Sequence, residues 1–575
     1  MNKRFIISFA FLSLGMMVRP AFVLGDISIE VQREAMQLQA DMIQMIDQRR
    51  DFQDQQMPNA EVQMEQQEPL PVVQGLSFQV NEIILEGNTI FPAEQFRSTI
   101  NRYEGRVLFL KDLQDLAKMI TVRYQMAGYM TSRAFIPTQR IYDGKVVIRI
   151  VEGRVGDISI SGNRYFIDNL FSDRMDLQRG QFFDMQQLAM SLQDINQLPD
   201  RYVKAYLQPG KETGTSNIVI VAQDRNPLHA SYEYNERGTD LTHISRHTLH
   251  LTNNNATGVG DSLQISMTGT DQNAFAGGVI QYVLPKPKDG LTYSINTGYD
   301  YSRLEKYLRS SKVTSSSFIV APGVTKSFIK APHLKVDGFI GLEVKGSKTL
   351  VDQSKLSYDR STVLDVGPRV VVDDNWGKTF VAGDVRVGIP DVLGASELHN
   401  PEASRVDSGG EFVYFTDSVD RLNRLPYGSY LVLHAGAQYS PMPLNSLEQD
   451  YLGGMYSVRG YPENDSAGDS GVNFSTELRI PPYFIPSEWR VWNSKDKTWR
   501  DSLSLIAFID GGRVFDHKRQ EDESAKDRTL LGAGTGVRYY LTPDMNCQAG
   551  IGFPFGDNST DGKHAEPYVS ARVGF

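Results

Sequence analysis

The stretch "GVNFSTELRI" (residues 471–480) decides the fold class, because polar and apolar side chains alternate along it. Alternation with a period of two is typical of a β-strand with two different faces. One face carries Val472, Phe474, Leu478 and Ile480. The other carries Asn473, Ser475, Glu477 and Arg479. An apolar face suits lipid and a polar face suits a wet lumen, so we expect Glu477 and Arg479 to point into a pore.

Similar runs follow one another from about residue 227 onward, separated by Gly, Asn, Asp and Ser. A soluble β-sandwich would alternate in the same way. Roughly 16 runs within about 350 residues favour a barrel instead. The last run, "PYVSARVGF" (567–575), also ends on an aromatic residue within a strand pattern. The sequence therefore predicts a membrane β-barrel of about 16 antiparallel strands over residues 225–575.

The overall composition excludes several classes of protein. Hydrophobic residues make up 40% of the 575 residues, which does not fit a helical membrane protein with repeated apolar runs of about 20 residues. The net charge of −10 disfavours nucleic acid as a partner. Cys547 is the only cysteine, so neither an intrachain disulfide nor a cysteine-based zinc site is expected.

The N-terminal region reads as three consecutive segments. Residues 1–25 carry a positive start and a short apolar core, which predicts a cleaved signal peptide; the core is too short for a membrane anchor. Residues 26–48 place apolar side chains at helical spacing, which predicts an amphipathic helix. Residues 49–76 are rich in Gln, Glu and Pro, which predicts a flexible linker.

An internal repeat follows the linker. "EIILEGNTIF" (82–91) and "DISISGNRYF" (157–166) match at an offset of 75 residues. Each copy continues with two helical patterns and two alternating strands, so the expected order is β-α-α-β-β twice. A period this long indicates two small α+β domains in tandem, over residues 77–153 and 154–224.

These features together resemble the two-partner secretion transporters of Gram-negative bacteria, whose repeats are called POTRA domains. The most specific matches are "GGMYSVRGY" (453–461), similar to the tip of that family's sixth extracellular loop, and "FIDGG" (508–512), similar to the barrel-wall motif that meets it. The stretch 128–153 is similar to the family's first POTRA domain. The resemblance implies an outer-membrane pore with periplasmic POTRA domains. It also implies export of a large β-helical exoprotein and contact with outer-membrane lipid or lipopolysaccharide.

The resemblance implies that a long re-entrant loop, about residues 441–471, folds back into the barrel. On the strand 502–510, alternation directs Phe508 and Asp510 into the lumen, and Arg459 offers a fork of donors that suits one carboxylate. The expected gating residues are Val458, Arg459, Gly460, Tyr461, Phe508, Asp510 and Gly511. Without the resemblance, an exposed arginine in a surface turn is the simpler interpretation. In a wet pore the pair would be worth about 1–3 kcal/mol.

The resemblance also assigns roles upstream of the barrel. Residues 26–48 are expected to plug the pore. In the second repeat, Tyr202, Lys204 and Tyr206 lie on one side of an expected edge strand, and an open edge can bind a client strand through main-chain hydrogen bonds. The alternative is a covered edge.

No feature predicts an enzyme, a cofactor or a metal site. "GAGTGVRYY" (532–540) lacks the strand–loop–helix context of a phosphate loop, and small residues on a barrel strand explain it better. The nine histidines show no ligand spacing, and the acidic stretch 516–527 is read as a solvated loop rather than a cation site. Two rival functions remain open at this point: a barrel-assembly insertase of the same superfamily, and a passive porin or adhesin.

Overall fold

The computed structural model describes residues 77–574 apart from residues 197, 332, 398–399, 406, 492–496, 518–526 and 543–544. The predicted signal peptide, amphipathic helix and linker (1–25, 26–48 and 49–76) lie outside the described residues. The described chain forms a smaller unit that ends at Pro227 and a larger one over Leu228–Phe575. Among the described residues, no helix combines the length and the apolar character needed to cross a membrane.

The smaller unit begins with the first predicted repeat. Its elements are β1 (Ser77–Val80), β2 (Glu82–Glu86), η1 (Ala93–Phe96), α3 (Arg97–Ile100), β3 (Arg106–Phe109), α4 (Leu110–Met126), β4 (Arg133–Phe135) and β5 (Lys145–Val151). The sheet order is β2-β5-β4, with β2 parallel and β4 antiparallel to β5. Strands β1 and β3 form an additional two-stranded sheet that the repeat pattern did not predict.

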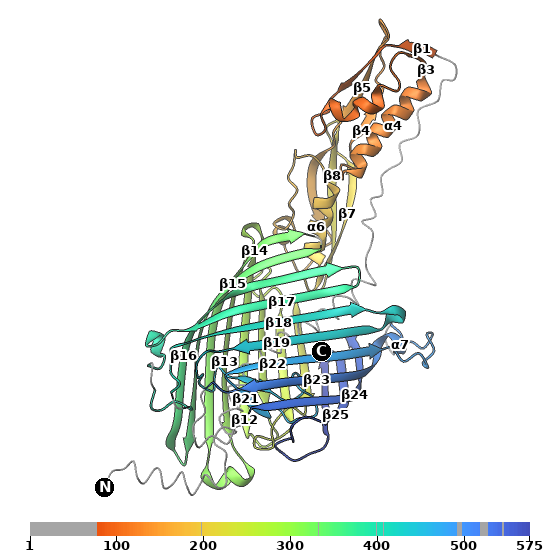
Figure 1. Cartoon of the computed structure of the whole chain (residues 1–575). Helices are drawn as coiled ribbons and strands as arrows, with labels where there is room; N and C mark the ends of the chain where they lie inside the picture. The colour runs from red at the N-terminus through yellow and green to blue at the C-terminus, as the bar shows by residue number, and fades with distance from the viewer. Residues whose placement is uncertain are drawn as a thin grey trace. The chain divides into compact units, whose positions relative to one another are not determined.

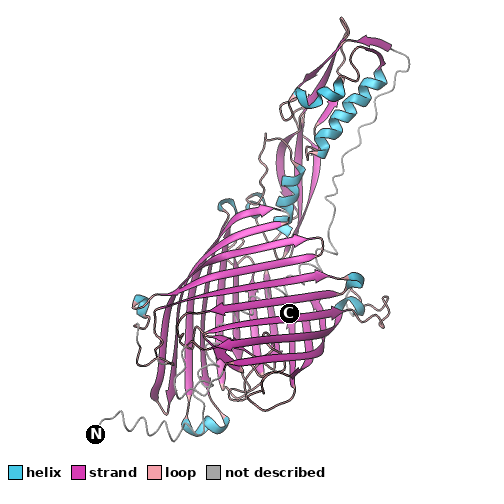
Figure 2. Cartoon of the chain, viewed as in Figure 1, coloured by secondary structure: helices cyan, strands magenta, loops and turns pink. Residues whose placement is uncertain are grey.

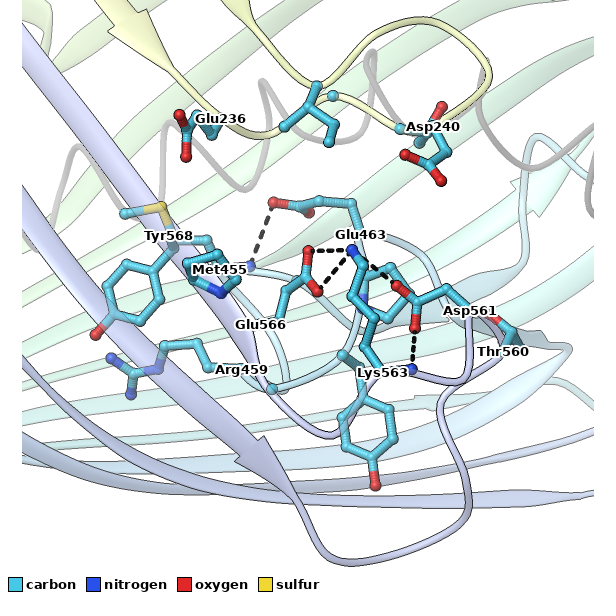
Figure 3. A pocket seen from close by; sticks show the side chains of 18 of the residues that line it. Glu236, Asp240, Met455, Arg459, Glu463, Thr560, Asp561, Lys563, Glu566 and Tyr568 are labelled. Atoms are coloured by element: carbon cyan, nitrogen blue, oxygen red, sulfur yellow. Dashed lines mark hydrogen bonds and ion pairs between the residues drawn. The ribbon is translucent and has the colours of Figure 1, made fainter. Parts of the chain in front are cut away.

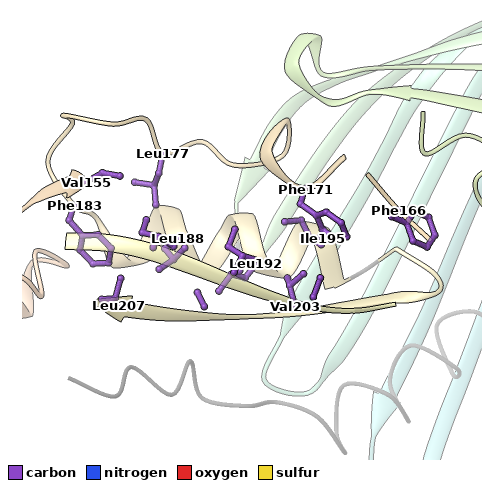
Figure 4. Packing of buried hydrophobic residues seen from close by; sticks show 14 residues of the cluster. Val155, Phe166, Phe171, Leu177, Phe183, Leu188, Leu192, Ile195, Val203 and Leu207 are labelled. Atoms are coloured by element: carbon purple, nitrogen blue, oxygen red, sulfur yellow. The ribbon is translucent and has the colours of Figure 1, made fainter. Parts of the chain in front are cut away.

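The second repeat has the same topology. Its elements are β6 (Arg154–Ser161), α5 (Asp168–Ser172), α6 (Met185–Asn196), β7 (Arg201–Pro209) and β8 (Thr215–Asp224). The sheet order β6-β8-β7, with β6 parallel to β8, leaves β7 at an edge. Figure 4 shows its core, in which Leu188, Leu192 and Ile195 of α6 pack over Val203 and Leu207 of β7. The predicted β-α-α-β-β order is confirmed, with β1 before it and β3 between α3 and α4 as additions in the first repeat.

The larger unit is a closed antiparallel barrel, visible as the ring of long strands in Figures 1 and 2. Its sixteen described strands are β9 (Leu228–Asn235), β10 (Arg246–Asn253), β11 (Ser262–Gly269), β12 (Phe275–Lys286), β13 (Leu291–Arg303), β14 (Thr314–Ala331), β15 (Leu334–Val351), β16 (Ser354–Asp374), β17 (Gly377–Gly388), β18 (Phe412–Arg424), β19 (Tyr430–Tyr439), β22 (Ser470–Ile480), β23 (Leu503–Phe515), β24 (Arg528–Thr542), β25 (Met545–Pro554) and β26 (Glu566–Gly574). The connections carry η2 (Pro287–Asp289), η3 (Lys306–Ser311), η4 (Val392–Gly394), η5 (Pro426–Gly428) and α7 (Trp499–Ser502). The prediction of about 16 antiparallel strands is confirmed.

The alternation of side chains orients β22 and β23 as predicted. On β23, Leu505 and Ile509 are exposed on the outer face, whereas Phe508 and Asp510 are buried. On β22, Val472 and Phe474 are exposed on the outer face as well. Strand β26 pairs with β9 and closes the barrel, so no edge strand remains. In a meander of this kind every second connection lies at the same end, which places the β19–β22 connection at the end opposite the entry into β9.

Candidate functional site in the barrel lumen

The connection between β19 and β22 is a long loop, residues 440–469, that folds back against the inner wall of the barrel. A re-entrant loop was expected at about residues 441–471, and the loop also contains a short hairpin of β20 (Asp450–Leu452) and β21 (Ser466–Gly468). Beyond the hairpin the chain forms the loop tip, residues 453–465. Gly453, Gly454 and Gly460 have φ angles of 111°, 94° and 103°, which side chains other than glycine rarely adopt.

Arg459 at the tip donates to two carboxylates of the barrel wall. Its Nε lies 2.7 Å from Asp510 Oδ2 and its Nη2 lies 2.9 Å from Asp510 Oδ1, which is a bidentate pair. Its Nη1 contacts Glu477, which also accepts from Arg479 Nε at 2.7 Å. Ser475 completes the set: its Oγ accepts from Arg459 at 3.2 Å and donates to Asp510 at 2.7 Å. The structure thus brings together the expected pair and adds Glu477 and Ser475 to it.

Burial makes the loss of one member of this network more costly than the sequence suggested. Arg459 is 8% exposed and Asp510 is fully buried, and the Arg459 guanidinium lies 3.6 Å from the centre of the Phe508 ring. The interpretation of one ion pair in a wet pore is therefore wrong, because the charges are removed from bulk water and share one network. Without Arg459, the wall has two carboxylates, Asp510 and Glu477, and one cation, Arg479, so Arg459 makes the cluster neutral.

Glycines on the wall form the seat of the tip. A Cβ at Gly532 on β24 would lie 1.9 Å from the Arg459 carbonyl oxygen, and a Cβ at Gly552 on β25 would lie 2.5 Å from the Gly460 nitrogen. Gly460 itself lies against the backbone of Phe553. No sequence pattern indicated Gly552, and Gly532 was interpreted only as a small residue on a strand. That reading is confirmed, because residues 532–540 lie within β24.

Two glycines of the wall motif face opposite sides of the barrel. A Cβ at Gly511 would lie 2.5 Å from the ring of Phe474, whose side chain is 44% exposed on the outer face. The inclusion of Gly511 among the gating residues is therefore a misplacement by one residue. Gly512 is the glycine that faces the loop, since a Cβ there would lie 2.7 Å from Leu452 of β20.

The remaining predicted tip residues are buried on either side of Arg459. Val458 and Tyr461 pack with Leu452 of the loop and with Val514 and Leu530 of the wall. The Tyr461 hydroxyl donates to the Leu531 carbonyl oxygen at 3.2 Å. On the other side, Phe508 packs with three further buried residues, namely Met455, Ile506 and Tyr568.

A cavity of about 520 Å³ opens beside the tip (Figure 3). Its lining comes from the tip, from the β9–β10 connection and from the β25–β26 connection, including Glu236, Asp240, Glu463 and Glu566. Lys563 lies among the carboxylates and binds Asp561 and Glu566 at 3.0 and 3.1 Å. Within the described part of the chain, no three His, Cys, Asp or Glu side chains are placed to hold a metal ion. Most of the acidic stretch 516–527 lies outside that part.

The predicted client-binding residues lie on the edge strand β7. Val203, Ala205 and Leu207 are buried in the core, and Tyr202, Lys204 and Tyr206 are half-buried on the opposite face. Among the described strands, β7 pairs with β8 alone. Part of its outer edge is covered, because the Val203 N–H donates to Asn196 Oδ1 at 2.7 Å and Asn196 Nδ2 donates to the Val203 carbonyl oxygen at 3.1 Å.

A closed sixteen-stranded barrel that holds a re-entrant loop by a buried arginine, preceded by tandem β-α-α-β-β units, defines a class of outer-membrane protein-transport pores. The comparison with protein families specifies which one. The model of the haemolysin secretion/activation protein family ShlB/FhaC/HecB matches residues 214–539, and that of the ShlB-type POTRA domain matches residues 78–153. The chain belongs to the haemolysin secretion/activation protein family.

Relatives and solved structures agree with this assignment. The chain is 22% identical over 507 residues to the outer membrane transporter CdiB of Dickeya dadantii, covering 84% of each protein. It is 21% identical over 423 residues to the heme/hemopexin transporter protein HuxB of Haemophilus influenzae, covering 72% of this chain and 74% of that protein. The structure of CdiB from Escherichia coli matches with a TM-score of 0.71 at 19% identity, covering 95% of this chain and 98% of that one.

Family membership fixes the general function. The protein is a two-partner secretion transporter of the outer membrane, and its POTRA units lie in the periplasm. Of the three functions left open by the sequence, secretion is therefore the one supported, rather than barrel assembly or passive permeation.

Proposed function

We propose that the loop tip, residues 453–465, is the gate of this secretion pore and that Arg459 is the residue that holds it closed. The observation that carries the proposal is the burial of Arg459 between Asp510, Glu477 and the Phe508 ring, at the tip of a loop that enters from the end of the barrel. Withdrawing a buried arginine from between two carboxylates is costly, so Arg459 favours the docked position of the loop. Export of a polypeptide then requires that this tip leave its seat.

The client is proposed to bind the second POTRA unit as an unfolded chain. Strand β7 offers the open part of its edge beyond Val203, and in an antiparallel ladder Ala205 and Leu207 direct their N–H and C=O groups to the same side as Val203. A client strand added there gains main-chain hydrogen bonds without a fixed sequence. Tyr202, Lys204 and Tyr206 would contact its side chains.

The client itself is proposed to be a large secreted β-helical exoprotein. This proposal is supported by the similarity of the chain to the transporters HuxB and CdiB and to the hemolysin transporter protein HpmB. We further propose that the chain divides into POTRA domains at 77–153 and 154–224 and a barrel at 225–575. The barrel is proposed to contact outer-membrane lipid or lipopolysaccharide.

Secretion by an Arg459→Ala variant tests the gate. We expect secretion of the partner to fall at least about tenfold, because the freed tip no longer returns to one defined position. Outer-membrane level and heat-modifiable migration of the barrel should stay near those of the unmodified protein. Arg513→Ala is the matched control, since Arg513 lies on β23, the strand that carries Asp510, and is half exposed, 3.7 Å from Asp527. Normal secretion by Arg459→Ala would contradict the proposal, and so would its loss from the membrane.

Substitution of the β7 edge tests the client-binding step. Ala205→Pro removes an outward N–H without removing a bond to β8, and proline is tolerated on edge strands. We expect secretion to fall several-fold while the POTRA unit stays folded. Lys204→Pro interrupts the ladder to β8 and should unfold the unit. It therefore shows how loss of the fold differs from loss of the outer edge alone. Undiminished secretion by Ala205→Pro would exclude the edge of β7 as the binding site.

A further inference from the structure

The loop has a second buried contact with the barrel, far from Arg459. The limb before β20, residues 444–449, packs against β15, β16 and β18. Asn445 Nδ2 donates to Ser361 Oγ at 3.1 Å, and Ser446 Oγ donates to Asp359 Oδ2 at 3.3 Å. Both residues are buried, which makes this limb part of the interior and not of the surface.

Glu448 is the charged residue of this limb. It is fully buried, and its Oε2 lies 3.0 Å from Lys345 Nζ of β15. The Tyr414 hydroxyl of β18 donates to the same oxygen at 2.8 Å. The other carboxylate oxygen, Oε1, is buried and has no hydrogen-bond partner among the described residues. A buried carboxylate oxygen without a donor costs free energy, so this contact is incompletely satisfied.

The charged side chains of the wall that surround Glu448 already balance one another without it. Lys345 lies 3.3 Å from Glu343, and Arg386 lies 2.6 Å from Glu343 and 3.1 Å from Asp365. Two carboxylates thus face two cations. Docking of Glu448 adds a third carboxylate and leaves the cluster with a net charge of −1. The nearby Arg369–Asp384 pair is neutral by itself, and Asp359 adds further negative charge beside the limb.

We propose that Glu448 is the release point of the re-entrant loop: the limb 444–449 leaves its seat before the tip does, because Glu448 brings a surplus negative charge into a balanced wall. This inference rests on the proposed function, in which the loop leaves the lumen during export. The two contacts are separate, since five strands of the barrel lie between β15, which carries Lys345, and β23, which carries Asp510. One end can therefore move while the other stays docked.

The experiment measures opening of each end directly, independent of secretion. In a Cys547→Ser background, Ser446→Cys reports on the limb and Ser457→Cys reports on the tip. The full-length protein in lipid vesicles is labelled with a membrane-impermeant maleimide, and the labelling rate reports local opening. The proposal requires opposite signs for two changes at one contact. Glu448→Gln should slow labelling at residue 446 about tenfold, and Lys345→Met should accelerate it about tenfold, with little change at residue 457.

The inference would be overturned if these substitutions changed the labelling rates in other directions. If Glu448→Gln accelerates labelling at residue 446, or leaves it unchanged, Glu448 is an ordinary anchor or has no role. Tyr414→Phe, which removes one donor to Glu448, should also accelerate labelling and replaces Lys345→Met should that variant fail to form a heat-modifiable barrel. Glu402→Gln is the matched control: it removes an exposed pair with Lys355 at 2.6 Å and should change neither rate. These results stand apart from the gate proposal, which fails only if Arg459→Ala secretes normally or is lost from the membrane.

Discussion

The two ends of the re-entrant loop are both buried and both charged, yet they differ in what they bring to the wall. At the tip, the wall carries a net negative charge until Arg459 neutralises it. At the limb, the cluster of Lys345, Arg386, Glu343 and Asp365 is neutral until Glu448 adds a carboxylate. The comparison shows that burial and short contacts do not define a strong anchor. The charge that the wall lacks before docking decides which end holds and which end releases.

The largest expected effect comes from removing Arg459 from the tip network. Arg459→Ala leaves two buried carboxylates with one cation, and breaking a buried pair in this way costs about 3–5 kcal/mol, on the order of a hundredfold or more in the docked population. Asp510→Ala should be milder, because Arg459 keeps Glu477. Labelling of a cysteine at residue 457 measures both variants.

The double variant decides whether neutrality is the cause. Arg459→Ala combined with Asp510→Ala should open no more than Arg459→Ala alone, since it removes one of the uncompensated carboxylates. Full additivity of the two single effects would mean that Arg459 and Asp510 act on the tip separately. The comparison between the two ends would then lose its basis.

The next largest effect concerns the shape of the seat rather than its charge. Gly552→Ala would place a methyl group 2.5 Å from the Gly460 backbone, which has no flexible side chain to move aside. We expect several-fold faster labelling at residue 457 and no change at residue 446. Gly269→Ala on β11 is the control, because its nearest neighbour would lie 3.9 Å away. Equal effects at both reporters would show that the loop opens as one rigid piece.

Sequence patterns predicted the residues at the tip of the loop but not the wall residues around them, because these depend on the register between strands. Period-two alternation gives the face of each strand, so Phe508 and Asp510 could be oriented; the same rule applied one residue further would have turned Gly511 outward. Placing Ser475 opposite Asp510 requires the pairing of β22 with β23 across a long connection. Glu448 lies in "PLNSLEQD" (443–450), a polar run that reads as a solvated loop. Its side chain contacts Lys345 of β15 and Tyr414 of β18, which are distant in sequence.

A smaller effect with a diagnostic sign is expected from Glu477→Gln. At the tip, loss of one carboxylate leaves Asp510 to face Arg459 and Arg479, an excess of positive charge, so docking should weaken and residue 457 should label about two- to fivefold faster. At the limb, the chemically identical change Glu448→Gln is expected to slow opening. If both changes act in the same direction, the contrast in wall charge does not govern the loop.

The smallest effect is a pH dependence expected where the limb meets β20. Asp450 on β20 follows Glu448 closely, and its Oδ2 is buried without a hydrogen-bond partner among the described residues. Burial raises the pKa of Asp450 to about 7, against the weaker opposite effect of a backbone hydrogen bond from Tyr451. The docked loop therefore binds a proton more tightly than the released loop, where the pKa returns to about 4. Docking is strongest at low pH and weakens as the pH rises from about 4 to about 7.

Labelling at residue 446 should accordingly be faster at about pH 8 than at about pH 5, after correction for the maleimide reaction with a free thiol, and residue 457 should show no such change. Asp450→Asn should make the rate at residue 446 independent of pH. A pH dependence that persists in Asp450→Asn, or that appears equally at the tip, would assign the titration to another group and remove Asp450 from the account.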